Sequence, residues 1–505
     1  MRWTRKARAG TGRRDARPIA PGSEDLAPDL RAVGERLRAA SRPVPRDPAF
    51  TARLRAELLL AHRGYAAPPP RRPRARRGRQ RWRLALLAAL LAAVGGGIAA
   101  AGILAPSPAP GTVLTGRGPI LRITFVGQTA AALAVDGRTG RAFVVTQGNL
   151  IRGAFPLLVV RVLDTATGMF LRTVPLGTAL GAANAVAVDS HVGHVFVAQE
   201  GARTGGADVV SMLDARSGAV LRRTMLSLRP PARTAPGTVL ARATMGVDER
   251  TGRAFITIPG NNAVAVFDTH SGALVRTIGV GLAPGALAVD ARRGRVVVAN
   301  EDDGTVSLLD ARSGQLLRTV AVGPSPTAVA IDARTGHAFV ALRGAPDRRG
   351  VLTLGRGHVA VLDVGTGQLL RTVAVRGTPS DVAVAAGMGH VFVVGAAFSG
   401  DGRVSMLDAA TGRVLRTSTV GAYPYAVAVV ARSGEVFITT MARPGVVSAH
   451  PDSAVSVLDA RTGRVTRTVR AGPGLLSPGP LAVDERRGQV FIANEGAVTV
   501  LDAAP

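Results

Sequence analysis

Short apolar runs recur along the chain from residue 120 to residue 502. In the segment Thr305–Leu342, four such runs alternate apolar and polar residues, and Asp-x-x-x-Gly or Gly-x-x-Pro turns separate them. β-branched residues are frequent in these runs, as is typical of strands. The four-strand unit returns every ~40–50 residues, a spacing typical of the blades of a β-propeller.

The unit can be counted from the ends of its strands. Its first strand ends, in successive units, at Asp136, Asp189, Asp248, Asp290, Asp332, Ala385, Val430 and Asp484. Its third strand ends at Asp164, Asp214, Asp268, Asp310, Asp363, Asp408, Asp459 and Asp502. The last unit lacks a fourth strand after its third, but Ile120–Gly127 matches the fourth strand Leu316–Gly323 position by position. We therefore expect an all-β, eight-bladed β-propeller over residues 119–505, closed by this N-terminal strand; seven blades are the alternative if one divergent unit forms no sheet of its own.

Several segments of the repeat resemble the YVTN-type propeller repeat. They are Val296–Asn300, Thr305–Asp310 and the run from Val322 through Pro326, with Phe491–Asn494 and the run from Gly421 through Pro424 as further copies. The resemblance extends over residues 119–502. It implies a propeller that is exported or attached to a cell surface, similar to the YncE-like and surface-antigen-like members, and it implies no defined activity.

The first 118 residues lack the repeat, and their composition divides them into five successive segments. We expect a disordered basic tail (1–22), a cytoplasmic helical segment (23–64), a Pro/Arg linker (65–83), a transmembrane helix (84–104) and a Pro/Gly spacer (105–118). Asp47-Pro48 is a typical helix start, and Phe50, Leu54 and Leu58 follow it at helical spacing.

The segment Leu84–Leu104 contains no charged residue and is long enough to cross the ~30 Å hydrocarbon core of a bilayer as a helix. Arginines crowd residues 71–83 immediately before it. Because positive charge stays on the cytoplasmic side, the sequence predicts a single-pass protein of the cell membrane, with its N-terminus cytoplasmic and its propeller extracytoplasmic. The leader and the span are too long for a cleaved signal peptide, which favours an uncleaved signal anchor.

The formal net charge of +29 changes this picture little. Its concentration beside the apolar span indicates contact with an anionic membrane surface, so we expect no nucleic-acid partner. On the propeller the arginine excess also fits an arginine-rich coding bias. The chain has no cysteine, which excludes disulfides, Cys–zinc sites and thiol nucleophiles.

The polar residues of the repeat are predicted to be structural. Asp310 and Asp332 each precede a glycine by four residues, as expected of an Asp that bonds the backbone of a tight turn. A phenylalanine recurs at one position of the second strand, which indicates core packing. His194, His337 and His390 share the position at which that strand starts, and we interpret it as solvated. We expect no cofactor, no metal site and no catalytic residue.

The connections are more informative than the strands. The long ones join the second strand to the third, or one blade to the next, and both kinds lie on the same face of a propeller disc. Variable loops on a rigid scaffold are common binding sites. On this face we list as candidate binding residues Glu200, Asn262, Asn300, Glu301, Arg343, Asp381, Asp401, Tyr423, Tyr425, Asn494 and Glu495.

Taken together, the sequence predicts a membrane-anchored, non-enzymatic binding module for a protein, a glycan or a small ligand. One alternative is a hydrolase or lactonase on a propeller scaffold, which would need polar side chains converging on the channel. The apolar first strands argue against it. A second alternative is a sensor that signals through the cytoplasmic helices.

Overall fold

A computed structural model describes a set of residues that all fall in one compact unit, residues 91–505. The described residues are 110, 112–115, 120–147, 157–178, 183–199, 208–226, 243–344, 356–397, 400–441, 454–470 and 479–503. The predicted tail, helical segment, linker and transmembrane helix lie outside them. Among the residues described, no helix is long and apolar enough to cross a membrane.

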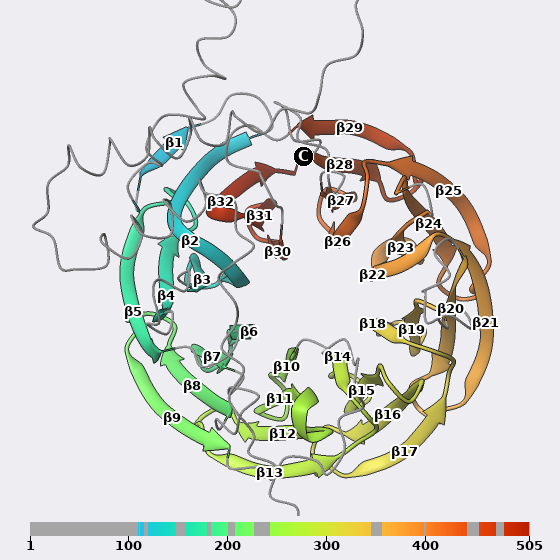
Figure 1. Cartoon of the computed structure of the whole chain (residues 1–505), viewed down its shortest axis with the longest axis horizontal. Coiled ribbons are helices and arrows are strands. Elements are labelled where there is room, and N and C mark those ends of the chain that lie inside the picture. The colour runs from blue at the N-terminus through green and yellow to red at the C-terminus, as the bar shows by residue number, and fades with distance from the viewer. Residues whose placement is uncertain are drawn as a thin grey trace, which may run out of the picture. The chain divides into compact units, whose positions relative to one another are not determined.

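The strands form a closed ring of blades, with the first strand of each blade innermost and the last one outermost (Figure 1). Blades 2 to 4 consist of β6 (Ala183–Asp189), β7 (His194–Gln199), β8 (Asp208–Asp214) and β9 (Val220–Leu226); β10 (Met245–Asp248), β11 (Arg253–Ile258), β12 (Ala263–Asp268) and β13 (Leu274–Gly279); and β14 (Pro284–Asp290), β15 (Arg295–Asn300), β16 (Thr305–Asp310) and β17 (Leu316–Ala321).

Blades 5 to 7 follow the same order. They consist of β18 (Pro326–Asp332), β19 (His337–Leu342), β20 (Arg356–Asp363) and β21 (Leu369–Arg376); β22 (Thr378–Ala385), β23 (His390–Ala396), β24 (Gly402–Asp408) and β25 (Val414–Val420); and β26 (Pro424–Val430), β27 (Glu435–Thr440), β28 (Ala454–Asp459) and β29 (Val465–Arg470). Two short 3-10 helices, Pro259–Asn261 and Ala386–Met388, lie in connections.

Blades 1 and 8 share one long strand, β2 (Ile120–Asp136). Its second half pairs with β3 (Arg141–Gln147), which continues into β4 (Leu157–Asp164) and β5 (Phe170–Thr178) as blade 1. Its first half pairs with β32 (Glu495–Asp502) from Ile120↔Leu501 to Phe125↔Ala497. With β30 (Leu481–Asp484) and β31 (Gln489–Ala493), this half completes blade 8. The predicted eight blades and the closing role of the N-terminal strand are confirmed.

One strand was not anticipated. β1 (Val113–Thr115) lies within the segment interpreted as a spacer, and it adds to the outer edge of blade 8 by pairing with β2, Leu114 opposite Ile123. The first half of β2 is therefore flanked on both sides, whereas the outermost strands of the other blades pair on one side only among the residues that the structure describes.

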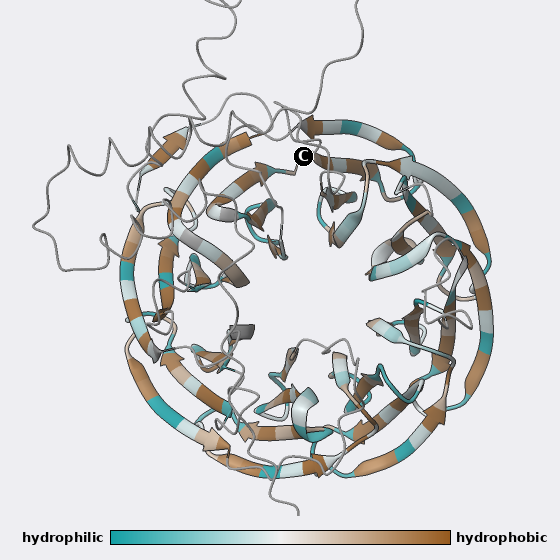
Figure 2. Ribbon diagram, in the orientation of Figure 1, coloured by the Kyte–Doolittle hydropathy of each residue, from teal (hydrophilic) through white to brown (hydrophobic). Residues whose placement is uncertain are grey.

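The core lies between neighbouring blades. The recurring phenylalanines of the second strands are almost completely buried: Phe143, Phe196, Phe255, Phe339, Phe392, Phe437 and Phe491. Each packs in a cluster drawn from two adjacent blades; Phe392, for example, contacts the group that holds Val427, Ile438 and Leu458. The predicted core role is confirmed. In Figure 2 the outermost strands carry both hydrophobic and hydrophilic residues, and hydrophobic side chains such as Leu316 and Leu317 are exposed on them.

An arginine occupies the third position of every outermost strand, and several of these arginines bond a backbone oxygen of the next blade. The eight are Arg122, Arg172, Arg222, Arg276, Arg318, Arg371, Arg416 and Arg467. Arg222 Nη1 donates to Ser271 O at 3.3 Å, Arg318 Nη1 to Thr366 O at 3.4 Å and Arg467 Nη2 to Asp502 O at 2.9 Å. Arg122 donates to Ala166 O, and this contact connects blade 8 to blade 1. Part of the arginine excess on the propeller is therefore structural.

Candidate functional site

The two faces of the disc differ in how their strands are connected. Each of the eight connections between first and second strands has four residues, and each of the seven between third and fourth strands has five. We call the side that carries them the short-turn face. On the opposite side, the long-loop face, connections range from one residue (Gly377, between β21 and β22) to 18 (residues 227–244, between β9 and β10).

Repeated hydrogen bonds fix the short-turn face. In each blade the residue after the third strand donates its N–H to the turn glycine between the first two strands, as Ala311 N does to Gly294 O at 3.0 Å. The turn aspartates accept backbone N–H groups: Asp332 Oδ1 from Arg334 at 3.0 Å, and Asp310 Oδ1 from Ser313 at 2.7 Å. Gly314 and Gly336 have positive φ, which suits glycine. The predicted turn-making role of Asp310 and Asp332 is confirmed.

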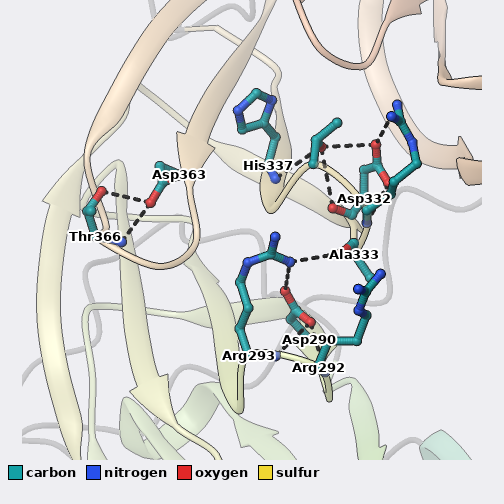
Figure 3. A network of polar contacts seen from close by, with 10 residues as sticks. Asp290, Arg292, Arg293, Asp332, Ala333, His337, Asp363 and Thr366 are labelled. Carbon is teal, nitrogen blue, oxygen red and sulfur yellow. Dashed lines mark hydrogen bonds and ion pairs between the residues drawn. The ribbon is translucent and has the colours of Figure 1, made fainter.

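Figure 3 shows how these turns also join blades. Arg293 Nη1 bonds Asp290 Oδ2 within its own turn at 3.0 Å and reaches Ala333 O of the next blade at 2.8 Å. The histidines act similarly. His194, His337 and His390 are half-buried, and each ring lies 2.7–3.0 Å from a carbonyl oxygen of the following blade. Our interpretation of this position as solvated was therefore wrong, because the neighbouring blade covers it.

Three candidate asparagines on the long-loop face bond within the propeller. Asn262 Oδ1 accepts the Ala283 N–H at 2.9 Å. Asn300 and Asn494 are buried, and their Nδ2 groups donate to hydroxyls of the adjacent strand, Thr305 and Thr499 respectively, at 2.9 and 2.8 Å. These side chains hold the ends of their strands together.

Glu301 and Arg343 are candidates of opposite charge that pair across two blades. They follow β15 and β19 of neighbouring blades, and Arg343 Nη1 lies 3.6 Å from Glu301 Oε1. Burial raises the pKa of Glu301, Arg343 opposes this shift, and Asp302 adds to it. Both side chains keep part of their surface exposed, so this pair is a polar contact available on the long-loop face.

Blades 6 and 7 depart most from the repeat, since neither has the first-strand aspartate. Tyr423, with φ of 42°, donates its N–H to Gly400 O at 3.1 Å and accepts that of Met441 at 3.2 Å. Tyr425 lies on the inner strand β26, and Asp401 closes the connection between β23 and β24. Glu495 opens β32, and Glu200 lies outside the described residues.

Asp381 replaces the alanine that Ala328 of blade 5 provides at the same position of the inner strand. Its Oδ1 accepts the Val382 N–H at 2.8 Å, and its Oδ2 accepts the N–H of Val427, in blade 7, at 2.9 Å. Burial among the inner strands raises the pKa of Asp381 to about 6, and the two backbone bonds only partly oppose this shift. Some of its surface remains exposed, although blade atoms surround the carboxylate. It joins two blades, with backbone donors on both oxygens.

Asp381→Asn should reduce the pH dependence of stability. Between the unfolded pKa of 3.8 and the folded value of about 6, only the folded chain keeps this proton, so stability falls as pH rises through that window. The shift corresponds to about 3 kcal/mol. Thermal unfolding of wild type and Asp381→Asn from pH 4 to pH 8 measures this effect. As pH rises, wild type should lose stability relative to Asp381→Asn. Parallel plots of melting temperature against pH would contradict the raised pKa of Asp381. Asp381→Ala, which also loses the Val427 bond, should be less stable throughout.

Comparisons with known proteins give limited further detail. A family model described as the outer membrane protein assembly factor BamB matches residues 355–504, less than a third of the chain. No curated protein matches. Among solved structures, BamB from Moraxella catarrhalis is 16% identical, with a TM-score of 0.48, over 77% of this chain and 100% of that one. Hydrazine synthase from Kuenenia stuttgartiensis is 20% identical, with a TM-score of 0.45, over 54% of this chain and 80% of that one.

The chain is a β-propeller, and that conclusion rests on its own strand pairing. In the part of the chain that the structure describes, no group of three or more His, Asp or Glu side chains is placed to hold a metal ion.

Proposed function

We propose that this propeller is a non-enzymatic binding module that takes a protein partner on its long-loop face. The contrast between the two faces carries the proposal: one is built of turns of constant length, and every connection of variable length is on the other. Evolution of a binding surface needs freedom in sequence and length, which a rigid scaffold supplies through its loops. The partial match to the BamB family model supports a protein as the partner.

We further propose the placement expected from sequence: a single-pass cell-membrane protein with the propeller on the extracytoplasmic side, of the YVTN type. The uncharged stretch of residues 84–104 and the arginines before it support this placement. If it is right, the full chain stays in the membrane fraction at alkaline pH, and a chain lacking residues 84–104 is released. Release of the full chain would contradict the anchor without affecting the binding proposal.

The binding proposal is tested by site-specific photocrosslinking of the full-length chain in its native membranes. A photoreactive residue at Arg343 or Tyr423 reports on the long-loop face, and one at Arg292 or Arg312 reports on the short-turn face. We expect both long-loop positions to capture the same protein, and Arg343→Glu, combined with the probe at Tyr423, to lower its yield. Equal capture from the two faces, or capture from the short-turn face alone, would reject the proposal.

A further inference from the structure

A cavity opens on the short-turn face, away from the proposed binding surface. Its volume is about 380 Å³, and turns from blades 8, 1, 2 and 3 line it. Its ionisable lining side chains are Arg138, His191, Glu249, Glu485 and Arg486. Its size is within the lower range of small-molecule sites.

A glycine allows two of the turns that border this cavity to approach each other closely. The residue after the first strand is Ser, Glu or Ala in seven blades, and Gly137 in blade 1 alone. A Cβ at Gly137 would lie 2.9 Å from Asp484 Oδ1 and 3.6 Å from the Arg486 side chain. The turns of blades 8 and 1 therefore approach each other closely, and the space beside them stays empty of side chain.

Buried aspartates fix the turns that border this space. The backbone N–H groups of Arg138, His191 and Arg486 donate to Oδ1 of Asp136, Asp189 and Asp484 at 2.9, 3.0 and 3.1 Å. These three carboxylates are almost fully buried, so each turn is held from beneath and its side chain projects from a rigid base.

The two arginines lack a neutralising partner among the described residues. Arg138 reaches only a backbone oxygen, His191 O at 3.4 Å, and no carboxylate lies within 4.0 Å of either guanidinium. An anion between them would gain charge-assisted, fork-shaped hydrogen bonds of the kind arginine forms with phosphate.

The acidic residues of the cavity each accept a backbone hydrogen bond through one oxygen. Glu249 Oε1 accepts the Ser190 N–H at 2.9 Å, and Glu485 Oε1 accepts the Ala431 N–H at 3.1 Å. The carboxylates are thereby held at the edges of the cavity, and their remaining lone pairs can accept hydrogen bonds from hydroxyl groups. This combination of two unpaired guanidinium groups with fixed carboxylates suits a molecule that carries both a phosphate and several hydroxyls.

We propose that this cavity binds a sugar phosphate, with the phosphate between Arg138 and Arg486 and the sugar hydroxyls on Glu249 and Glu485. The site is separate from the long-loop face, so the proposal stands or falls independently of the protein-binding function. Gly137 is required because any side chain there would collide with the turn of blade 8.

Calorimetric titration of the full-length chain with glucose 6-phosphate tests the proposal. Inorganic phosphate and glucose serve as separate probes. Arg138→Gln and Arg486→Gln should each weaken binding about tenfold, which corresponds to ~1.4 kcal/mol. Arg292→Gln is the matched control: it occupies the same turn position in blade 4, above Asp290, and does not line the cavity. Binding to this variant should match wild type, and the melting temperatures of all three variants should be unchanged.

Each other outcome overturns the assignment. If glucose 6-phosphate bound Arg138→Gln and Arg486→Gln as tightly as wild type, the two arginines would not hold the phosphate. An equal loss of affinity in Arg292→Gln would mean that the effect comes from the net charge of the protein and not from this cavity. Inorganic phosphate binding as tightly as glucose 6-phosphate would exclude the sugar contacts. Failure of all three probes to bind at 10 mM would reject the site.

Discussion

Ile123→Pro is expected to open the propeller ring. Ile123 lies in the half of β2 that pairs with both β1 and β32, opposite Leu114 and Thr499. Proline removes a backbone donor and disturbs the ladder of a strand flanked on both sides, which costs ~3 kcal/mol or more. Loss of this strand also exposes the edge of β32. Urea unfolding followed by far-UV circular dichroism should show a clearly lower midpoint than that of the wild type. In amide hydrogen exchange of the variant, the amides of β32 should exchange first.

Thr319→Pro is the control for that experiment. Thr319 holds the equivalent place on β17, but it pairs on one side only, with Ser307. Its substitution should cost much less, because the blade keeps its other three strands and the ring stays closed. Equal losses in the two variants would mean that the N-terminal strand has no special role in closure.

Phe392→Ala is expected to destabilise the propeller by about 3–5 kcal/mol, as is typical when a buried aromatic side chain is removed from a packed core. Phe392 has no exposed surface and fills the cluster between blades 6 and 7. Phe170→Ala is the matched control. Phe170 is only half-buried, on the outer strand β5, with Arg161 5.3 Å from its ring, and its removal should cost far less. Comparable unfolding midpoints for the two variants would contradict the inter-blade core.

The fold could be predicted closely because its signals are local. Each strand of the repeat ends at a turn whose aspartate and glycine are visible in the sequence, and all sixteen predicted ends of first and third strands coincide with the structure. The closing strand was predictable for a related reason: Ile120–Gly127 repeats the pattern of the fourth strands, and the C-terminal unit lacks one.

Contacts between blades were harder to foresee. The arginine at the third position of each outer strand recurs in all eight blades, and this regularity was the available signal. Sequence alone gave it no partner, since its acceptor is a carbonyl of the next blade, 44 residues away for Arg122 with Ala166 and 48 for Arg318 with Thr366. The histidines were misinterpreted for the same reason, because each ring lies against a carbonyl of the following blade.

The candidate binding residues, too, were only partly predictable from the sequence. The position of the candidate residues on the long-loop face followed from the strand order, but their burial did not. Asn300 and Asn494 proved to be buried side chains that donate hydrogen bonds within their own blades. The opening at Gly137 depends on how closely the turns of blades 8 and 1 approach. The repeat pattern predicts each turn separately, and it contains no information on the distance between the turns of neighbouring blades.

The most direct test of the closed eight-bladed ring uses the absence of cysteine from the chain. Phe125 and Ala497 are paired across β2 and β32, so Phe125→Cys with Ala497→Cys should form an intramolecular disulfide, detected by mass spectrometry. Linking positions this far apart in sequence should raise stability by up to about 5 kcal/mol. Phe125→Cys with Val498→Cys places the thiols on opposite faces and should remain reduced. A closed eight-bladed ring predicts a disulfide in the first pair only; reduced thiols in the first pair, or a bond in the second alone, would contradict this closure.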